Sequence, residues 1–143
     1  MSESPFFYLT LDQVEELHDL AVEGFGGRPG VLNPDNLQLA CQAPYDVWQQ
    51  ERGDLWEQAA AYACTIIQHP PYHDGNKRTA LACTLVFLEV NGYDQHDFHE
   101  GTLFEAISWL ARNELDRRNF AQYLRDAYHG ASGIWAEDTG PGG

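Results

Sequence analysis

The sequence predicts an all-α domain of about six helices packed around a central helix at residues 76–91. Apolar residues recur at helical spacing in several segments, and most of these segments begin with a residue that can cap a helix. The stretch 79–90 is apolar on nearly every face, which is typical of a helix that other helices enclose. The length of 143 residues and the apolar share of 43% suit one domain with a hydrophobic core.

Two helices are expected before residue 44. Thr10 and Gln13 can form a capping box, in which the hydroxyl and the amide side chain each satisfy a free backbone N–H at the helix start. The glycine-rich stretch 24–27 ends that first helix. Asn33 and Pro34 fit the N-cap and first position of a second helix.

The second helix is expected to run to about Cys41 and to end at Pro44. A loop at 44–53 then contains Tyr45 and Trp48. Aromatic side chains in a loop indicate either a binding edge or rings folded back onto the core, and the sequence leaves both open.

Four further helices are expected after residue 54. They are expected at 55–68, at 76–91, from about 102, and at 117–128. Asp54 and Thr102 are the expected caps of the first and third of these. The remaining residues, 130–143, are glycine-rich and are expected to be a flexible tail behind a domain at 1–129.

The charge argues against several partners. A net charge of −14 repels nucleic acids and anionic membranes, so direct contact with either is not expected. The N-terminus lacks the pattern of a signal peptide and no apolar run is long enough to span a bilayer, so the expected location is the cytoplasm. Three cysteines lie in apolar surroundings and are expected to be reduced, buried thiols: Cys41, Cys64 and Cys83.

The segment 69–80, His-Pro-Pro-Tyr-His-Asp-Gly-Asn-Lys-Arg-Thr-Ala, is the most unusual part of the chain. Its end forms the start of the central helix, where free backbone N–H groups and the helix dipole favour an anion. Gly75 permits close approach of a phosphate. Lys77, the single lysine of the chain, and Arg78 add positive charge there.

Two other side chains of the segment suit phosphate chemistry. Asp74 offers a hard oxygen ligand for a Mg²⁺ ion that also touches phosphates. His69, at the other end of the loop, can act as a general base near neutral pH. Together these residues match the needs of phosphoryl or nucleotidyl transfer.

The segment resembles the signature of the Fic/Doc family, H-P-F-x-D-G-N-K/G-R. The run Asp-Gly-Asn-Lys-Arg-Thr-Ala-Leu at 74–81 is similar to the Doc (death-on-curing) branch. The similarity also includes residues 7–10, 26–30 and 87–93, and so extends over nearly all of the chain up to about Tyr128.

The resemblance implies a role for each matching residue. His69 would take the proton of a target hydroxyl, and Asp74 would hold Mg²⁺. The backbone of Gly75, Asn76 and Lys77 would form the anion-binding turn, and Arg78 would bind nucleotide phosphates. Tyr72 would replace the usual Phe that anchors the loop, and the family's hairpin-like flap would fall at about 44–53.

The chain departs from the family pattern in three places. His69 and Asp74 are five positions apart, where the family usually has four, and Pro71 looks like the insertion. His73 is therefore an alternative base. Position 77 is Lys where AMP-transferring members have Gly, and position 81 is Leu where they often have a second Arg.

The function that the resemblance implies is that of a toxin-type protein kinase. It would use ATP and Mg²⁺ to transfer the γ-phosphate to a hydroxyl of a translation factor similar to elongation factor Tu. The family's inhibitory sequence, S/T-x-x-x-E-G/N, has no match here, which implies control by a separate antitoxin protein. The alternatives are a Fic-type AMP transferase and a catalytically idle binding module whose longer loop misplaces the base.

The remaining polar groups are expected to have structural or solvent-exposed roles. The cluster at 94–100 contains residues able to bind a metal, but solvated loop residues are the favoured interpretation. His18 and His129 lie near helix ends, where a capping or surface role is expected. Arg117 and Arg118 begin the last helix, the unfavourable end for a cation, which an acidic neighbour or a partner would explain.

Overall fold

The computed structural model describes the backbone of residues 3–139 and the side chains of residues 3–128. The described part is helical and contains no strand, which confirms the all-α prediction. The helices are α1 (Leu11–Phe25), α2 (Pro34–Glu51), α3 (Leu55–Gln68), α4 (Asn76–Val90), the 3₁₀ helix η1 (Gln95–Asp97), α5 (Glu100–Ala111) and α6 (Arg117–Thr139). No helix of this part is both long and apolar enough to cross a bilayer.

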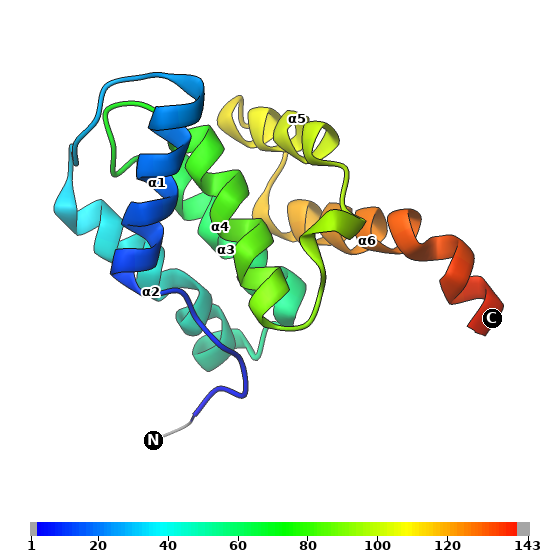
Figure 1. Cartoon of the computed structure of the whole chain (residues 1–143). Helices are drawn as coiled ribbons and strands as arrows, with labels where there is room; N and C mark the ends of the chain where they lie inside the picture. The colour runs from blue at the N-terminus through cyan, green and yellow to red at the C-terminus, as the bar shows by residue number, and fades with distance from the viewer. Residues whose placement is uncertain (1–2, 140–143) are drawn as a thin grey trace.

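Two helices, not one, form the centre of the bundle. α3 packs against α2, α4, α5 and α6, whereas α4 packs against α1, α3 and α5 (Figure 1). Ala59, Ala60 and Ala63 on α3 are completely buried. Small side chains let the backbones of α3 and α4 approach closely, so the apolar α4 that the sequence singled out shares the centre with the alanine-rich α3.

Local capping at the starts of α1 and α3 follows the sequence prediction. Thr10 accepts a hydrogen bond from the Gln13 amide at 3.1 Å, and the Gln13 side chain accepts one from the Thr10 amide at 2.8 Å. Asp54 accepts the Glu57 amide at 2.9 Å. These contacts depend only on residues three positions apart, so the sequence alone was enough to find them.

The predicted end of the second helix is wrong. α2 continues through Pro44 to Glu51 and ends at Arg52, which adopts the left-handed conformation with φ 51°. Leu37, Ala40, Pro44 and Val47 are buried along one face, at helical spacing. The proline removes one backbone hydrogen bond, at a cost of about 3 kcal/mol, and burial of this apolar stripe offsets that cost.

The predicted loop and flap at 44–53 are therefore wrong as well, because most of this stretch is helical. Its two aromatic residues are half-buried and face the N-terminal segment. Trp48 packs edge-on against Phe6, and Tyr45 packs edge-on against Tyr8. The two rings therefore fold back onto the N-terminal segment, whose Phe6 and Tyr8 pack against the core.

The connection between α4 and α5 contains the predicted acidic and histidine-rich cluster. Asp94 caps η1 by accepting the His96 amide at 2.9 Å. His99, not Thr102, is the N-cap of α5, because its Nδ1 accepts the Thr102 amide at 3.1 Å. A histidine ring nitrogen replaces the expected hydroxyl, and α5 starts three residues earlier than that cap would place it.

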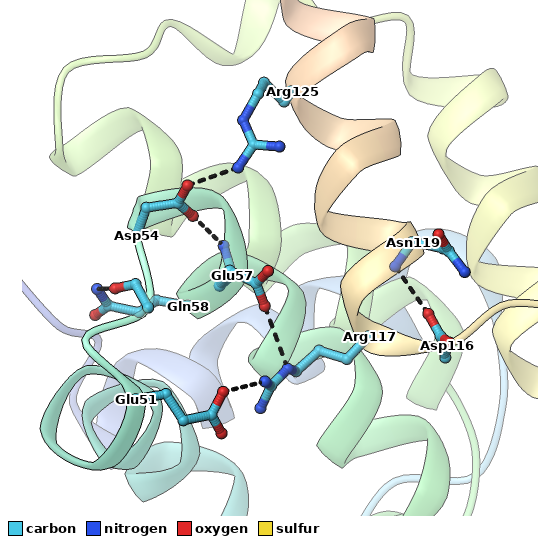
Figure 2. Close-up of polar contacts among 9 residues, drawn as sticks. Glu51, Asp54, Glu57, Gln58, Asp116, Arg117, Asn119 and Arg125 are labelled. Carbon is cyan, nitrogen blue, oxygen red and sulfur yellow. Dashed lines mark hydrogen bonds and ion pairs between the residues drawn. The ribbon is translucent and has the colours of Figure 1, made fainter.

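The start of α6 is joined to α2 and α3 by ion pairs (Figure 2). Arg117 Nη2 lies 2.6 Å from Glu51, and its Nε lies 3.5 Å from Glu57. Arg125 lies 2.6 Å from Asp54, the cap of α3. Acidic neighbours on other helices thus explain the cation at the unfavourable end of α6.

The backbone of α6 is helical to Thr139, further than the predicted end at Tyr128. Residues 140–143, the end of the predicted tail, lie outside the described residues. The division into a domain at 1–129 and a flexible tail stays a prediction.

Candidate active site

The start of α4 has no side-chain cap. Gly75 is its N-cap, with φ 80° and ψ 13°, and no side chain in the described part of the chain bonds to the first turn. The Thr79 amide donates to the Gly75 carbonyl at 2.9 Å and closes that turn. The amides of the three residues between them have no acceptor within the helix, so the helix presents N–H donors and the positive end of its dipole.

The loop before α4 is closed by a side-chain amide. Asn76 Nδ2 donates to the Tyr72 carbonyl at 2.9 Å, and the Tyr72 amide donates to Asn76 Oδ1 at 3.2 Å. This pair of hydrogen bonds ties the loop residue to the first residue of the helix. The Asn76 side chain therefore fixes the conformation of the predicted anion-binding turn.

A buried histidine of α1 supports the same loop. The His18 ring stacks on the Tyr72 ring with centroids 3.5 Å apart and planes 4° from parallel. Its Nε2 lies 2.8 Å from the carbonyl oxygen of Asp74. Both rings are 2% exposed, and burial raises the pKa of the Tyr72 hydroxyl.

The connection between α1 and α2, residues 26–33, lies beside the loop, and we call it the clasp (Figure 1). The amides of Leu32 and Asn33 donate to the Pro71 carbonyl at 2.7 and 3.0 Å. The Arg28 amide donates to the Asp74 carboxylate at 2.7 Å. A Cβ on Gly27 would lie 3.0 Å from Cβ of Asp74, so a side chain there would push the clasp and Asp74 apart, and φ 119° also favours glycine.

Comparison with known proteins identifies the family of this chain. Residues 8–88 match the model of the Fic/DOC family. The chain belongs to the Fic/Doc family. It is 30% identical to the protein kinase doc of Escherichia phage P1 over 125 residues, which is 87% of this chain and 98% of the phage protein. It is also 31% identical to the toxin Doc of Mycolicibacterium smegmatis over 105 residues, which is 70% of this chain and 79% of that protein. Both relatives place it in the Doc-like branch.

In this Doc-like chain, the two cations of the segment have different surroundings. Arg78 lies between two rings, with its guanidinium carbon 4.0 Å from the centroid of Phe25 and 3.9 Å from that of Phe104. Lys77 is exposed. Among the described residues neither makes an ion pair, so no carboxylate of this part of the chain neutralises them.

The two candidate bases also differ in their surroundings. His69 is the C-cap of α3 and is exposed, and its backbone amide donates to Thr65 at 2.8 Å. His73 is half-buried, and its Cδ2 lies 3.9 Å from the place where a Cβ on Gly30 would be. His69 thus lies at the start of the loop and His73 faces the clasp.

Pro71, the extra residue relative to the family signature, makes specific contacts with the clasp. Pro71 is buried, and its carbonyl is the acceptor of the two clasp hydrogen bonds. Tyr72, directly after it, forms an isolated antiparallel bridge with Val31 of the clasp. The extra residue therefore connects the loop to the clasp by hydrogen bonds and does not bulge into solvent.

The surroundings of Asp74 suit a metal ion that would be bound together with the phosphates of a nucleotide. Among the described residues, no group of three acidic, histidine or cysteine side chains could bind a metal by itself. Asp74 is exposed, and of its two carboxylate oxygens only Oδ2 accepts a hydrogen bond from a described residue. Mg²⁺ is commonly bound by one or two carboxylates together with phosphate and water oxygens, which is the arrangement that Asp74 and the start of α4 can offer.

His18 is the residue of this site that sequence reasoning missed. The sequence placed it near a helix end and predicted a surface or capping role, and that interpretation is wrong because His18 lies in the middle of α1 and its side chain is buried. Val14, His18 and Ala21 are the buried residues of α1 and recur at helical spacing. That spacing was the available signal, since it puts a polar ring on the inward face.

Proposed function

We propose that this protein is a Doc-type toxin that transfers the γ-phosphate of ATP to a hydroxyl of a translation factor in the cytoplasm, with elongation factor Tu as the expected target. The observation that carries the proposal is the uncapped start of α4 directly after Asp74. The chain is also similar to a phage protein that is named as a kinase, and the similarity covers 98% of that protein. This similarity supports the same activity.

Each predicted site residue has a role in the proposed reaction. The backbone amides from Gly75 to Lys77, with the Arg78 side chain, bind the phosphates of ATP. Asp74 holds Mg²⁺, which when bound offsets the negative charge of the phosphates. His69 accepts the proton of the target hydroxyl, and Tyr72 anchors the loop that carries these groups.

Lys77 and Leu81 favour a kinase over AMP transfer. The family resemblance associates Lys at the first position with phosphate transfer, and AMP-transferring members often have an Arg at the second. A separate antitoxin protein, covering the site, is the expected means of control. The longer loop is the observation behind the second candidate, an idle binding module.

The test uses ATP labelled at either the α- or the γ-phosphate. Each is incubated with Mg²⁺, bacterial lysate and wild type, His69→Ala or His73→Ala. We expect protein label from the γ-position only, lost by about 100-fold or more in His69→Ala and largely kept in His73→Ala.

Other outcomes separate the alternatives. Label from the α-position would mean AMP transfer. Loss in His73→Ala with retention in His69→Ala would assign the base to His73. No label from either position, in a lysate to which purified elongation factor Tu has been added, would favour the idle module.

A further inference from the structure

His18 is a polar ring in a place where an apolar side chain would pack at lower cost. It is 2% exposed, and an imidazole buried without a hydrogen bond is unfavourable. Within the described residues, its one close polar contact is Nε2 to the Asp74 carbonyl oxygen at 2.8 Å. The carboxylate of the exposed Asp19 is 4.0 Å from Nδ1, too far for a hydrogen bond. The hydrogen-bonding capacity of the His18 ring is therefore used on the backbone of Asp74.

The direction of that hydrogen bond follows from its acceptor. A backbone carbonyl can only accept, so Nε2 of His18 must carry the proton and donate it. In a trans peptide the N–H points opposite to the C=O. By fixing the Asp74 carbonyl, His18 turns the N–H of Gly75 the other way, and that N–H has no acceptor among the described residues.

Asp74 is held from two sides. His18 of α1 binds its carbonyl oxygen, and the Arg28 amide of the clasp binds its carboxylate at 2.7 Å. A Cβ on Gly75 would lie 3.5 Å from both Cδ2 and Nε2 of His18, so the ring also adjoins the first residue before α4. Stacking on Tyr72 fixes the plane of the ring itself.

We propose that His18 is a positioning residue for nucleotide binding. Its Nε2–H, donated to the Asp74 carbonyl, and its stack on Tyr72 set the turn that aims the Asp74 carboxylate and the first amides of α4 at a Mg²⁺-bound nucleotide. The proposal rests on the proposed function. It deepens that function by assigning to α1 a role in binding and none in proton transfer.

The test separates the two contacts of the ring. His18→Phe keeps a ring for the stack but removes the N–H donor, whereas His18→Gln keeps an N–H donor and removes the ring. Asp19→Asn, on the same helix and exposed, is the matched control. Binding of Mg²⁺·ATP is measured by calorimetry, transfer of γ-label at saturating nucleotide gives the turnover, and thermal unfolding checks that each variant folds.

We expect His18→Phe to weaken Mg²⁺·ATP binding by about 10- to 100-fold, the range for losing a residue that orients a ligand. His18→Gln should recover part of this loss, and Asp19→Asn should match wild type. Turnover at saturating nucleotide should change much less than binding. Hydrogen exchange of the amides at 75–78 should be faster in His18→Phe than in wild type.

The other outcomes are distinct. Unchanged Mg²⁺·ATP binding in a folded His18→Phe would overturn the positioning role. Wild type that binds Mg²⁺·ATP but transfers no label would overturn the kinase alone, and the binding comparison would still decide the role of His18. Wild type that does not bind Mg²⁺·ATP would overturn both.

Discussion

One backbone angle sets the start of α4. Gly75 has φ 80°, in the left-handed region that side-chain residues rarely adopt. A Cβ there would meet His18 at 3.5 Å, an ordinary van der Waals distance. The need for glycine at this position is therefore conformational and not a matter of space.

Gly75→Ala should lower the free energy of unfolding by about 1–2 kcal/mol, the cost of the left-handed conformation for a residue with a Cβ. Urea unfolding measures it. Gly24→Ala is the matched control, because Gly24 lies inside α1 and a Cβ there would meet nothing within 4 Å. The control should be neutral or stabilising by up to about 1 kcal/mol. Equal effects of the two substitutions would contradict the conformational argument.

At the scale of elements, the junction of α6 with α2 and α3 depends on charge pairing (Figure 2). Arg117 is partly buried, which by itself lowers the pKa of its guanidinium, but the hydrogen bond and charge of Glu51 and the charge of Glu57 raise it. The net direction is upward, so the pairs more than offset the burial. Arg118, next to it, is exposed and makes no ion pair with a described residue.

Arg117→Gln should lower the free energy of unfolding by roughly 1–2 kcal/mol, because it leaves two carboxylates at the junction without their cation. Arg118→Gln, the neighbouring control, should change it by less than about 0.5 kcal/mol. Both are measured by urea unfolding at low and at high salt. A loss of equal size in the two variants would show that general charge, and not this junction, is responsible.

At the scale of the whole molecule, two of the three thiols that were predicted to be buried lie in the core. Cys64 and Cys83 are buried, Cys41 is half-buried, and none forms a disulfide. Burial raises the pKa of all three thiols, and it raises that of Cys64 from 9.0 to about 12, helped by Asp116 and Glu57 and opposed by Arg117. The core therefore keeps these groups protonated where an unfolded chain would lose the protons.

This linkage predicts a loss of stability in alkali. Between pH 9.0 and about 12 the unfolded chain has released the Cys64 proton and the folded protein has kept it, so the unfolded state binds fewer protons. The free energy of unfolding then falls by up to about 1.4 kcal/mol per pH unit for each such thiol. Urea unfolding in reducing buffer across this range should show a shallower fall for Cys64→Ala, and a smaller change for Cys41→Ala. Parallel curves for wild type and Cys64→Ala would contradict the shift.

The sequence by itself determined the features that depend on near neighbours. The Thr10–Gln13 capping box, the cap at Asp54 and the glycine before α4 all involve residues within three positions of one another. The helical class and the Fic/Doc signature belong with these, because periodicity and motif are properties of consecutive residues.

Only the tertiary structure decided the features whose partners are distant in the chain. The path of α2 through Pro44 depends on an apolar face buried against α3, and Arg117 depends on Glu51, 66 positions away. His18 and Asp74 are 56 positions apart, and Arg28 and Asp74 are 46 apart. The free energy of a buried polar group or an interior proline is set by what surrounds it after folding, and spacing along the chain does not contain that information.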